Sequence, residues 1–399
     1  MSAAVHGTPI QIRQATWATR SLFAVLGIVA GAWGVHIPSV KEVYGLSEGS
    51  LSLVLVAAAV GAVSALFIAG RAIGRLGARN AVAVAGVLMG LMLMLVVHWP
   101  GYVPLLLAML VFGSTMSVYD VGINTEGSAL EAAGGRPIMG GLHGMFSVGA
   151  MLGAALTALL LRWEVSVALQ LGGVGVCASV WMVLASRWML PTAPVTEASA
   201  ETPQFVWPRG ALLIMGLLIF AGMSAEGVMQ DWSVLYLKQE VQMPQDRAAI
   251  GYAAFAGAMA VMRFLADILR TRFSERLLLR GSGVLTAVAM AVVLLSGNPL
   301  VSVIGFAFVG AGLAMVVPIL FGAASRVPGT TPAAAIAAVS SIGYSGFMIG
   351  PPLIGGIAQH ASLTAAMGVV VVTATILALS AHYVPEKQND ATAGQPSLA

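Results

Sequence analysis

Two carboxylates each stand four residues before an amide in otherwise apolar stretches, Asp120 before Asn124 and Glu226 before Gln230. Residues four apart share one face of a helix, so each carboxylate and its amide would point the same way. An ionisable group inside a bilayer is costly and marks a function with a partner. Each pair could therefore bind a proton on the carboxylate and a polar solute on the amide. The alternative is a buried polar link between helices, because such groups also bridge neighbouring spans.

Four further ionisable residues lie in or beside apolar stretches. Arg263 and Asp267 are four apart, and this spacing favours an internal ion pair with a structural or gating role. Asp231 follows the Glu226 stretch towards its outer end, where a gate or cap is expected. An imidazole ordinarily titrates near neutral pH, so His143 could accept a proton or contact a solute, although a histidine at a helix end is often simply hydrogen-bonded.

Aromatic side chains near these groups could line a cavity and stack on a solute, and helix packing is an equal alternative for each. The candidate solute contacts, amides and histidine included, are Asn124, Gln230, Trp33, Tyr119, His143, Phe146 and Tyr344.

The composition indicates which elements hold these residues. Of 399 residues, 58% are hydrophobic and only 9% are charged, against about 25% charged in a soluble domain. A water-soluble enzyme is thereby excluded. A bilayer span needs about 20 mostly apolar residues, and only helices or closed barrels satisfy the backbone in lipid. The apolar runs are long and not alternating, so we predict an all-α membrane protein with twelve spans. The predicted spans are 18–38, 50–72, 80–98, 102–125, 138–161, 166–186, 211–236, 248–268, 277–296, 299–322, 333–358 and 363–384.

One long polar segment, 187–210, divides the chain into two predicted six-helix bundles, 18–186 and 211–384. The halves echo one another, since each has an arginine cluster after its second span. Two similar halves are typical of secondary transporters, whose site lies between them. The remaining segments, 1–17 and 385–399, are predicted to be cytoplasmic, as is the 187–210 linker.

The distribution of Lys and Arg predicts the orientation. With a cytoplasmic N-terminus, only Lys41, Arg162, Lys238 and Arg247 fall on the outer side, and Arg263 falls within a span. The other basic residues lie on the inner side or its border, which is a strong positive-inside bias. We therefore expect both termini in the cytoplasm.

The loop after the second span reads Gly70-Arg-Ala-Ile-Gly74-Arg75-Leu-Gly77-Ala-Arg79. It resembles the Gly-x-x-x-Asp-Arg/Lys-x-Gly-Arg-Arg/Lys signature of the major facilitator superfamily, with Gly74 in place of the acid. The second-half counterpart keeps its acid as Asp267. The resemblance covers essentially the whole chain, and it implies the two-bundle fold of that superfamily and a cytoplasmic gating role for Arg75, Arg263 and Asp267.

Within the superfamily, three stretches are similar to the fucose-permease-like sugar/proton symporters. They are Tyr119-Asp120-Val-Gly-Ile-Asn124, His143-Gly-Met-Phe-Ser147 and Gly350-Pro351-Pro352. The resemblance implies proton symport of a sugar-like solute across the plasma membrane, the inner membrane of a bacterium.

The expected function is secondary active transport of a small neutral polar solute, with the proton as coupling ion on Asp120 or Glu226. The alternative is a proton-coupled drug or metabolite efflux antiporter of the same fold. No phosphate-binding loop, zinc-protease motif or nucleophile elbow occurs in the sequence. We therefore expect no enzyme activity, metal or cofactor. The expected partners are the solute and the lipid bilayer, without nucleic acid or an obligatory protein partner, so the chain is expected to be a monomer.

Overall fold

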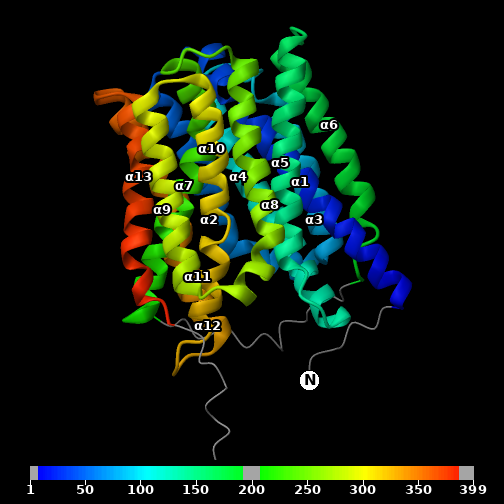
Figure 1. Cartoon of the computed structure of the whole chain (residues 1–399). Helices are drawn as coiled ribbons and strands as arrows, with labels where there is room; N and C mark the ends of the chain where they lie inside the picture. The colour runs from blue at the N-terminus through cyan, green and yellow to red at the C-terminus, as the bar shows by residue number, and fades with distance from the viewer. Residues whose placement is uncertain (1–7, 192–206, 386–399) are drawn as a thin grey trace, which may run out of the picture.

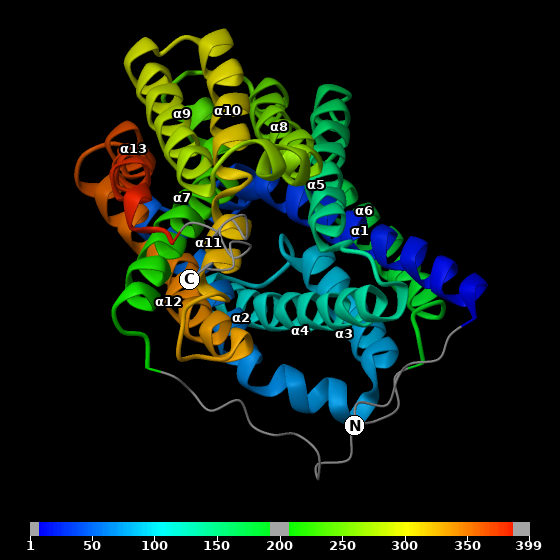
Figure 2. The same ribbon diagram turned by 60° about the horizontal axis from the view of Figure 1, so that its bottom comes forward.

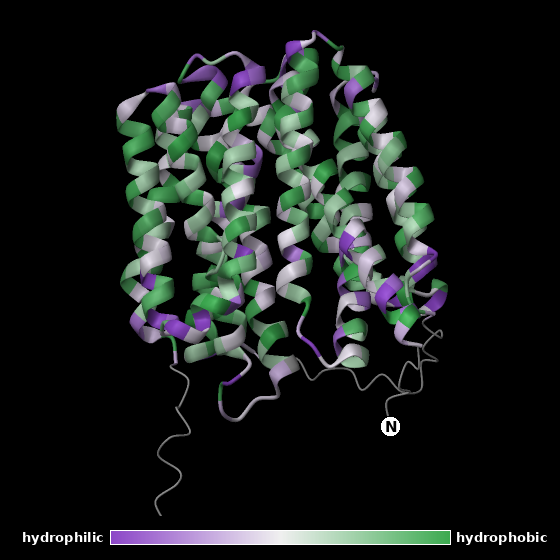
Figure 3. Ribbon diagram, turned by 45° about the vertical axis from the view of Figure 1, so that its right-hand side comes forward, coloured by the Kyte–Doolittle hydropathy of each residue, from purple (hydrophilic) through white to green (hydrophobic). Residues whose placement is uncertain are grey.

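The computed structural model describes residues 8–191 and 207–385. Within those residues the regular structure is entirely helical, and twelve segments are long and apolar enough to cross a membrane. Apolar residues cover the middle of the helices, and many of the polar ones lie at their ends (Figure 3). The prediction of an all-α membrane protein with twelve spans is confirmed.

The first half forms one bundle, in which α1 packs against α5 and α6, α2 against α4, and α3 against α4 and α6. Its helices are α1 (Pro9–Val43), α2 (Glu48–Leu76), α3 (Ala78–Leu95), α4 (Tyr102–Gly134), α5 (Met139–Arg162) and α6 (Val167–Ser186).

The second half repeats this packing order, with α7 against α12 and α13, α8 against α10, and α9 against α10 and α13. Its helices are α7 (Ala211–Gln239), α8 (Gln245–Arg272), α9 (Glu275–Ser296), α10 (Pro299–Leu313), α11 (Val316–Ala324), α12 (Pro332–His360) and α13 (Leu363–Ser380), followed by the short 3-10 helix η2 (Ala381–Tyr383). The two bundles meet where α5 packs on α8, α2 on α12 and α1 on α7 (Figures 1 and 2).

Three helices differ most from their predicted spans, and one of them, α4, ends at Gly134 rather than 125. The first helix begins at Pro9 rather than 18. The Gln11 backbone N–H donates to Thr8 Oγ1 and the Thr8 backbone N–H donates to Gln11 Oε1, and these two bonds form a capping box at its start. The predicted tenth span is broken into α10 and α11. Pro318 has no N–H to donate to the carbonyl of Ala314, so the helix breaks there.

Parts of three predicted segments lie outside the described residues. They are 1–7 of the 1–17 segment, 192–206 of the 187–210 linker and 386–399 of the 385–399 tail.

A matching bond closes each bundle at the predicted cytoplasmic end. The Arg79 guanidinium, at the start of α3, donates to the carbonyl of Met189, just after α6. The Arg276 guanidinium, at the start of α9, donates to the carbonyl of Val384, just after η2, at 2.8 Å. We call these two bonds the bundle clasps. Each holds the end of its bundle's last helix against the third helix of the same bundle.

Candidate functional site

The α4 pair lies as its spacing predicts. Asn124 Nδ2 donates to the Asp120 side chain at 3.0 Å and to the Asp120 carbonyl at 2.9 Å. Both side chains are half-buried. Among the residues that the structure describes, no cation lies within ion-pair distance of Asp120. The amide is thus the partner of a carboxyl group that lies in the middle of a span.

The α7 pair has the same internal bond and one more partner. Gln230 Nε2 donates to Glu226 Oε1 at 3.1 Å, and an Arg263 guanidinium nitrogen lies 3.2 Å from the same oxygen. Glu226 is buried, with 8% of its surface exposed. A buried carboxylate needs a compensating charge and hydrogen bonds to be tolerated, and Glu226 has both.

Arg263 joins the two bundles. It projects from α8 in the second bundle, and its other guanidinium nitrogen donates to Ser147 Oγ at 2.6 Å and to the carbonyl of His143 at 3.4 Å, both on α5 of the first bundle. Ser147 was not among the predicted site residues. Its signals in the sequence were its place in the His143–Ser147 stretch and the aromatic-Ser pair that both halves share.

The expected Arg263–Asp267 ion pair is not formed, and this expectation was wrong. Arg263 pairs with Glu226 instead, while Asp267 is exposed one turn further along α8. The physical reason is that an unpaired charge costs more in a buried place than in an exposed one. Asp267 does face the other bundle, since a side chain added at Gly140 of α5 would lie 4.0 Å from its Oδ2. Arg75 is exposed at the same predicted cytoplasmic end.

The aromatic candidates separate into two groups. Tyr119 is fully buried, and its hydroxyl donates to the carbonyl of Leu22 on α1 at 3.2 Å, so it belongs to the packing inside the first bundle. Trp33 is also buried and packs against Phe112, with ring centroids 5.9 Å apart. Tyr344 is 37% exposed on α12 and is close enough to Asp120 to interact with it electrostatically.

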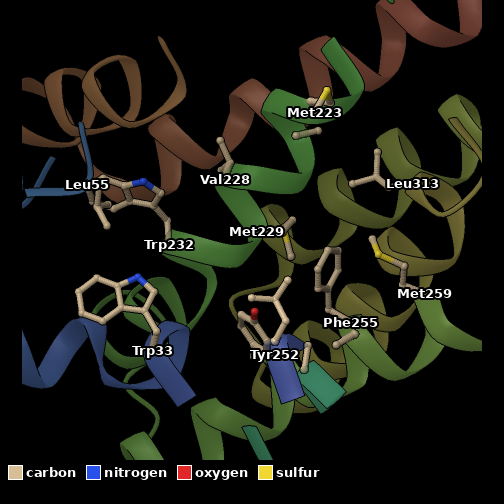
Figure 4. Close-up of a cluster of buried hydrophobic side chains, with 14 of the residues drawn as sticks. Trp33, Leu55, Met223, Val228, Met229, Trp232, Tyr252, Phe255, Met259 and Leu313 are labelled. Carbon is tan, nitrogen blue, oxygen red and sulfur yellow. The ribbon is translucent and has the colours of Figure 1, made fainter. Parts of the chain in front are cut away.

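The remaining candidates lie near Arg263 or at the contact between the bundles. The ring of His143 packs edge-on against Phe23 with centroids 5.4 Å apart, and Phe146 is half-buried on the next turn of α5. Asp231 is half-buried on α7. Beside it, Trp232 lies across from Trp33 and next to Leu55 of α2 (Figure 4). The structure thus gathers Glu226, Gln230, Arg263 and the His143 backbone at one point, and Asp120 and Asn124 at another.

The predicted outer end is closed by a directional chain of hydrogen bonds. Gln245 Nε2 of α8 donates to Ser39 Oγ of α1 at 2.7 Å, and Ser39 lies 3.1 Å from His36 Nδ1. His36 Nε2 lies 3.1 Å from Gln170 Oε1, whose amide nitrogen already donates to the Val165 carbonyl. This arrangement assigns the proton of neutral His36 to Nε2 and makes Nδ1 the acceptor for Ser39.

An ion pair and close packing reinforce the closure. Lys238 of α7 lies 2.5 Å from Glu42 of α1, which joins the two bundles. A side chain added at Gly34 would overlap Tyr252 of α8, and one added at Gly355 of α12 would overlap Ser52 of α2. At the other end of α2, side chains added at Gly70 and Gly74 would meet nothing within 4 Å. The bundles are therefore tightly joined at the predicted outer end and leave this part of α2 uncovered at the predicted cytoplasmic end.

Two buried carboxylates at the predicted cytoplasmic end were not singled out in the sequence. Glu126 of α4 is 1% exposed and accepts from the Leu190 amide at 2.6 Å. Glu275 of α9 is 5% exposed and pairs with Arg270 at 3.0 Å and with Arg326. Both lie beside the bundle clasps, so we assign them to the packing of the bundles and not to solute binding.

No group of three or more metal-ligating His, Cys, Asp or Glu side chains occurs within the described residues. The polar centre described above is built from carboxylates, amides and one guanidinium.

Comparison with known proteins identifies the family. The Major Facilitator Superfamily model matches residues 22–342 and, in a second match, residues 236–398. The chain is 33% identical over 386 residues to an uncharacterized MFS-type transporter of Yersinia pestis, a match that covers 96% of this chain and 100% of that protein.

Solved structures share the fold. A D-xylose-proton symporter superposes with a TM-score of 0.76 at 16% identity, covering 94% of this chain and 98% of that one. FucP in its outward conformation superposes with a TM-score of 0.65 at 16% identity, covering 93% and 98%. These likenesses concern the fold, and the family model and the Yersinia pestis relative show that the chain belongs to the major facilitator superfamily.

Proposed function

We propose that the chain is a proton-coupled symporter of a small, neutral, polar solute, and that Asp120 is its principal proton-binding group. The observation that supports this is the difference in charge compensation between the two carboxylates. Glu226 is paired with Arg263, whereas Asp120 has only the Asn124 amide among the described residues. A carboxyl group without a cation in the membrane interior is least costly as the neutral acid.

Coupling requires that the two forms of Asp120 bind the solute differently, because a ligand shifts a conformational equilibrium only through differential affinity. The neutral acid has an O–H to donate, whereas the carboxylate can only accept. Asn124 adds donors on the same face of α4, and Tyr344 of α12, in the other bundle, is within the range of electrostatic interaction with Asp120. A solute held here would touch both halves as they alternate.

A neutral solute fits the charges of the site. Arg263 is already engaged by Glu226 and Ser147, so its charge is compensated before any solute arrives. A multiply charged anion would need cations of its own. Hydroxyl groups, in contrast, can bond to the free capacity of Asp120, Asn124 and Gln230.

The setting of the proposal is the plasma membrane, the bacterial inner membrane, with both termini in the cytoplasm. The transporter would act as a monomer without a cofactor, and the proton would be its coupling ion. Names given to other proteins of this fold include D-xylose-proton symporter and fucose:proton symporter, so the fold is compatible with this chemistry.

The test has two stages. A thermal-shift screen of the purified chain against sugars, polyols and drugs, at acidic and at neutral pH, would first identify a bound solute. Uptake of that solute into reconstituted vesicles would then be measured with and without an imposed pH difference. We expect the solute to accumulate against its concentration gradient as protons move with it from the acidic side to the less acidic side. A solute flux that is the same with and without the imposed pH difference would overturn the proposal.

A further inference from the structure

A small cavity lies between α7 and α12, inside the second bundle. Its walls come from one face of α7 and from the stretch of α12 that ends in a proline pair. The lining residues used here are Ser224, Asp231, Trp232, Phe347, Gly350 and Pro351. Its volume of about 10 Å³ suits a single water-sized group and no more.

Two polar groups on its walls have no protein partner. Ser224 Oγ and the Trp232 indole nitrogen are buried and make no hydrogen bond, with their residues 5% and 0% exposed. Buried polar groups in native proteins are almost always hydrogen-bonded, to protein or to ordered water. Two such groups on one cavity indicate that something polar belongs between them.

Two further lining residues, one on α7 and one on α12, supply acceptors. Asp231 lines the cavity, and within residues 8–191 and 207–385 it has no hydrogen-bond or ion-pair partner. Pro351 has no N–H, so the carbonyl of Phe347 one turn earlier does not receive the usual helical bond. The residues that line the cavity thus carry a carboxyl group, a carbonyl without its helical bond, a hydroxyl and an indole N–H.

This combination selects the occupant. The indole N–H disfavours a bare cation, and the carboxyl group disfavours an anion. A hydroxyl-type oxygen is compatible with this set, because it can accept from Trp232 and Ser224 and donate towards Asp231 or the Phe347 carbonyl. We propose that the α7–α12 cavity is a binding site for one hydroxyl-type oxygen, either a water molecule or a single hydroxyl of the solute. This assignment stands whether or not transport is coupled to protons.

Radiolytic footprinting of the full-length chain tests the proposal. A brief X-ray pulse makes hydroxyl radicals from bound water, and mass spectrometry locates the oxidised side chains. We expect Trp232 to be labelled although it is 0% exposed. A Trp232 that stays unlabelled in the unmodified protein would overturn the proposal, and this result requires no variant to fold.

A pair of glycine variants in α12 supplies the matched control. Gly350 is buried and lines the cavity, and an added side-chain carbon there meets nothing within 4 Å, so Gly350→Ala fills space without a clash. Gly356→Ala adds the same methyl to an exposed position of the same helix that also has no neighbour within 4 Å. We expect loss of Trp232 labelling in the first variant and none in the second. Equal labelling in both would contradict the proposal.

Added solutes distinguish the two sources of the oxygen. Glycerol, D-xylose and myo-inositol are each added before the pulse. A fall in Trp232 labelling would assign the site to a solute hydroxyl, while unchanged labelling with all three would assign it to water. Both results support a hydroxyl-type site.

Discussion

The α4 and α7 pairs have the same sequence pattern and different surroundings. In each, an amide four residues on donates to the carboxylate, at 3.0 Å in α4 and 3.1 Å in α7. Only the α7 carboxylate also receives a guanidinium, which comes from α8. The comparison teaches that a spacing within one helix determines the near partner, while the chemistry of the carboxylate depends on what a neighbouring helix supplies.

The largest effect is expected from Asp120→Asn, which removes the proton-binding group and keeps a polar side chain of similar shape. Uphill accumulation of the solute should be lost, while exchange of labelled for unlabelled solute should persist, because exchange needs no net proton movement. Both are measured in reconstituted vesicles. If the variant accumulates solute fully at every pH, Asp120 has no part in coupling.

The next largest effect is expected from Arg263→Met, which leaves Glu226 buried without its cation. Removing one partner of a buried ion pair costs about 3–5 kcal/mol. The midpoint temperature of thermal unfolding in detergent should therefore be well below that of the parent protein.

The double variant Arg263→Met with Glu226→Gln is the control for this loss. It should recover most of the stability, because no uncompensated charge remains. A single variant as stable as the parent would show that the Arg263–Glu226 pair is energetically unimportant, and the contrast with Asp120 would be lost.

A smaller effect is expected from Glu226→Gln alone. The Gln230 bond can be kept, and Arg263 retains Ser147 and the His143 carbonyl. Accumulation should be reduced and should still respond to an imposed pH difference, because Asp120 is intact. Loss of accumulation with exchange preserved would reverse the roles assigned to the two carboxylates.

The smallest effect is expected from Ser147→Ala, which removes one hydrogen bond between the bundles at 2.6 Å. One such bond contributes about 1 kcal/mol. The population of molecules in which α5 and α8 lie close together at the predicted cytoplasmic end should therefore fall several-fold. Spin labels would be attached to cysteines introduced by Arg136→Cys and Arg272→Cys in a Cys177→Ser background. The distribution of distances between the labels, measured by double electron–electron resonance, would report that population.

Ser345→Ala is the matched control for this variant. Its hydroxyl donates only within α12, to Ile342 at 2.6 Å, so the distance distribution should not change. If both serine variants shift the distribution equally, the Arg263–Ser147 bond does not hold the bundles together.

The sequence was sufficient for the twelve spans, since apolar length alone identifies them. It also predicted both carboxylate–amide pairs, because four-residue spacing fixes a common helix face. The pairing of Arg263 could not be predicted in the same way. The choice between Asp267 on its own helix and Glu226 on another depends on helix rotation and on burial, neither of which a periodic pattern encodes.

The same limit applies to contacts between distant segments. The bond from Gln245 to Ser39 joins residues 206 positions apart, and neither side chain is unusual enough to be singled out. Tyr119 shows that adjacency in sequence can also mislead. It lies next to Asp120 in the chain and was a candidate solute contact, but its hydroxyl donates to a carbonyl inside the first bundle.

The bundle clasps imply that each half is a self-contained assembly. The bond from Arg79 to Met189 has its donor and acceptor in the first half, and the bond from Arg276 to Val384 has both in the second half. If the two halves are expressed together as separate polypeptides, they should therefore associate in the membrane and restore activity.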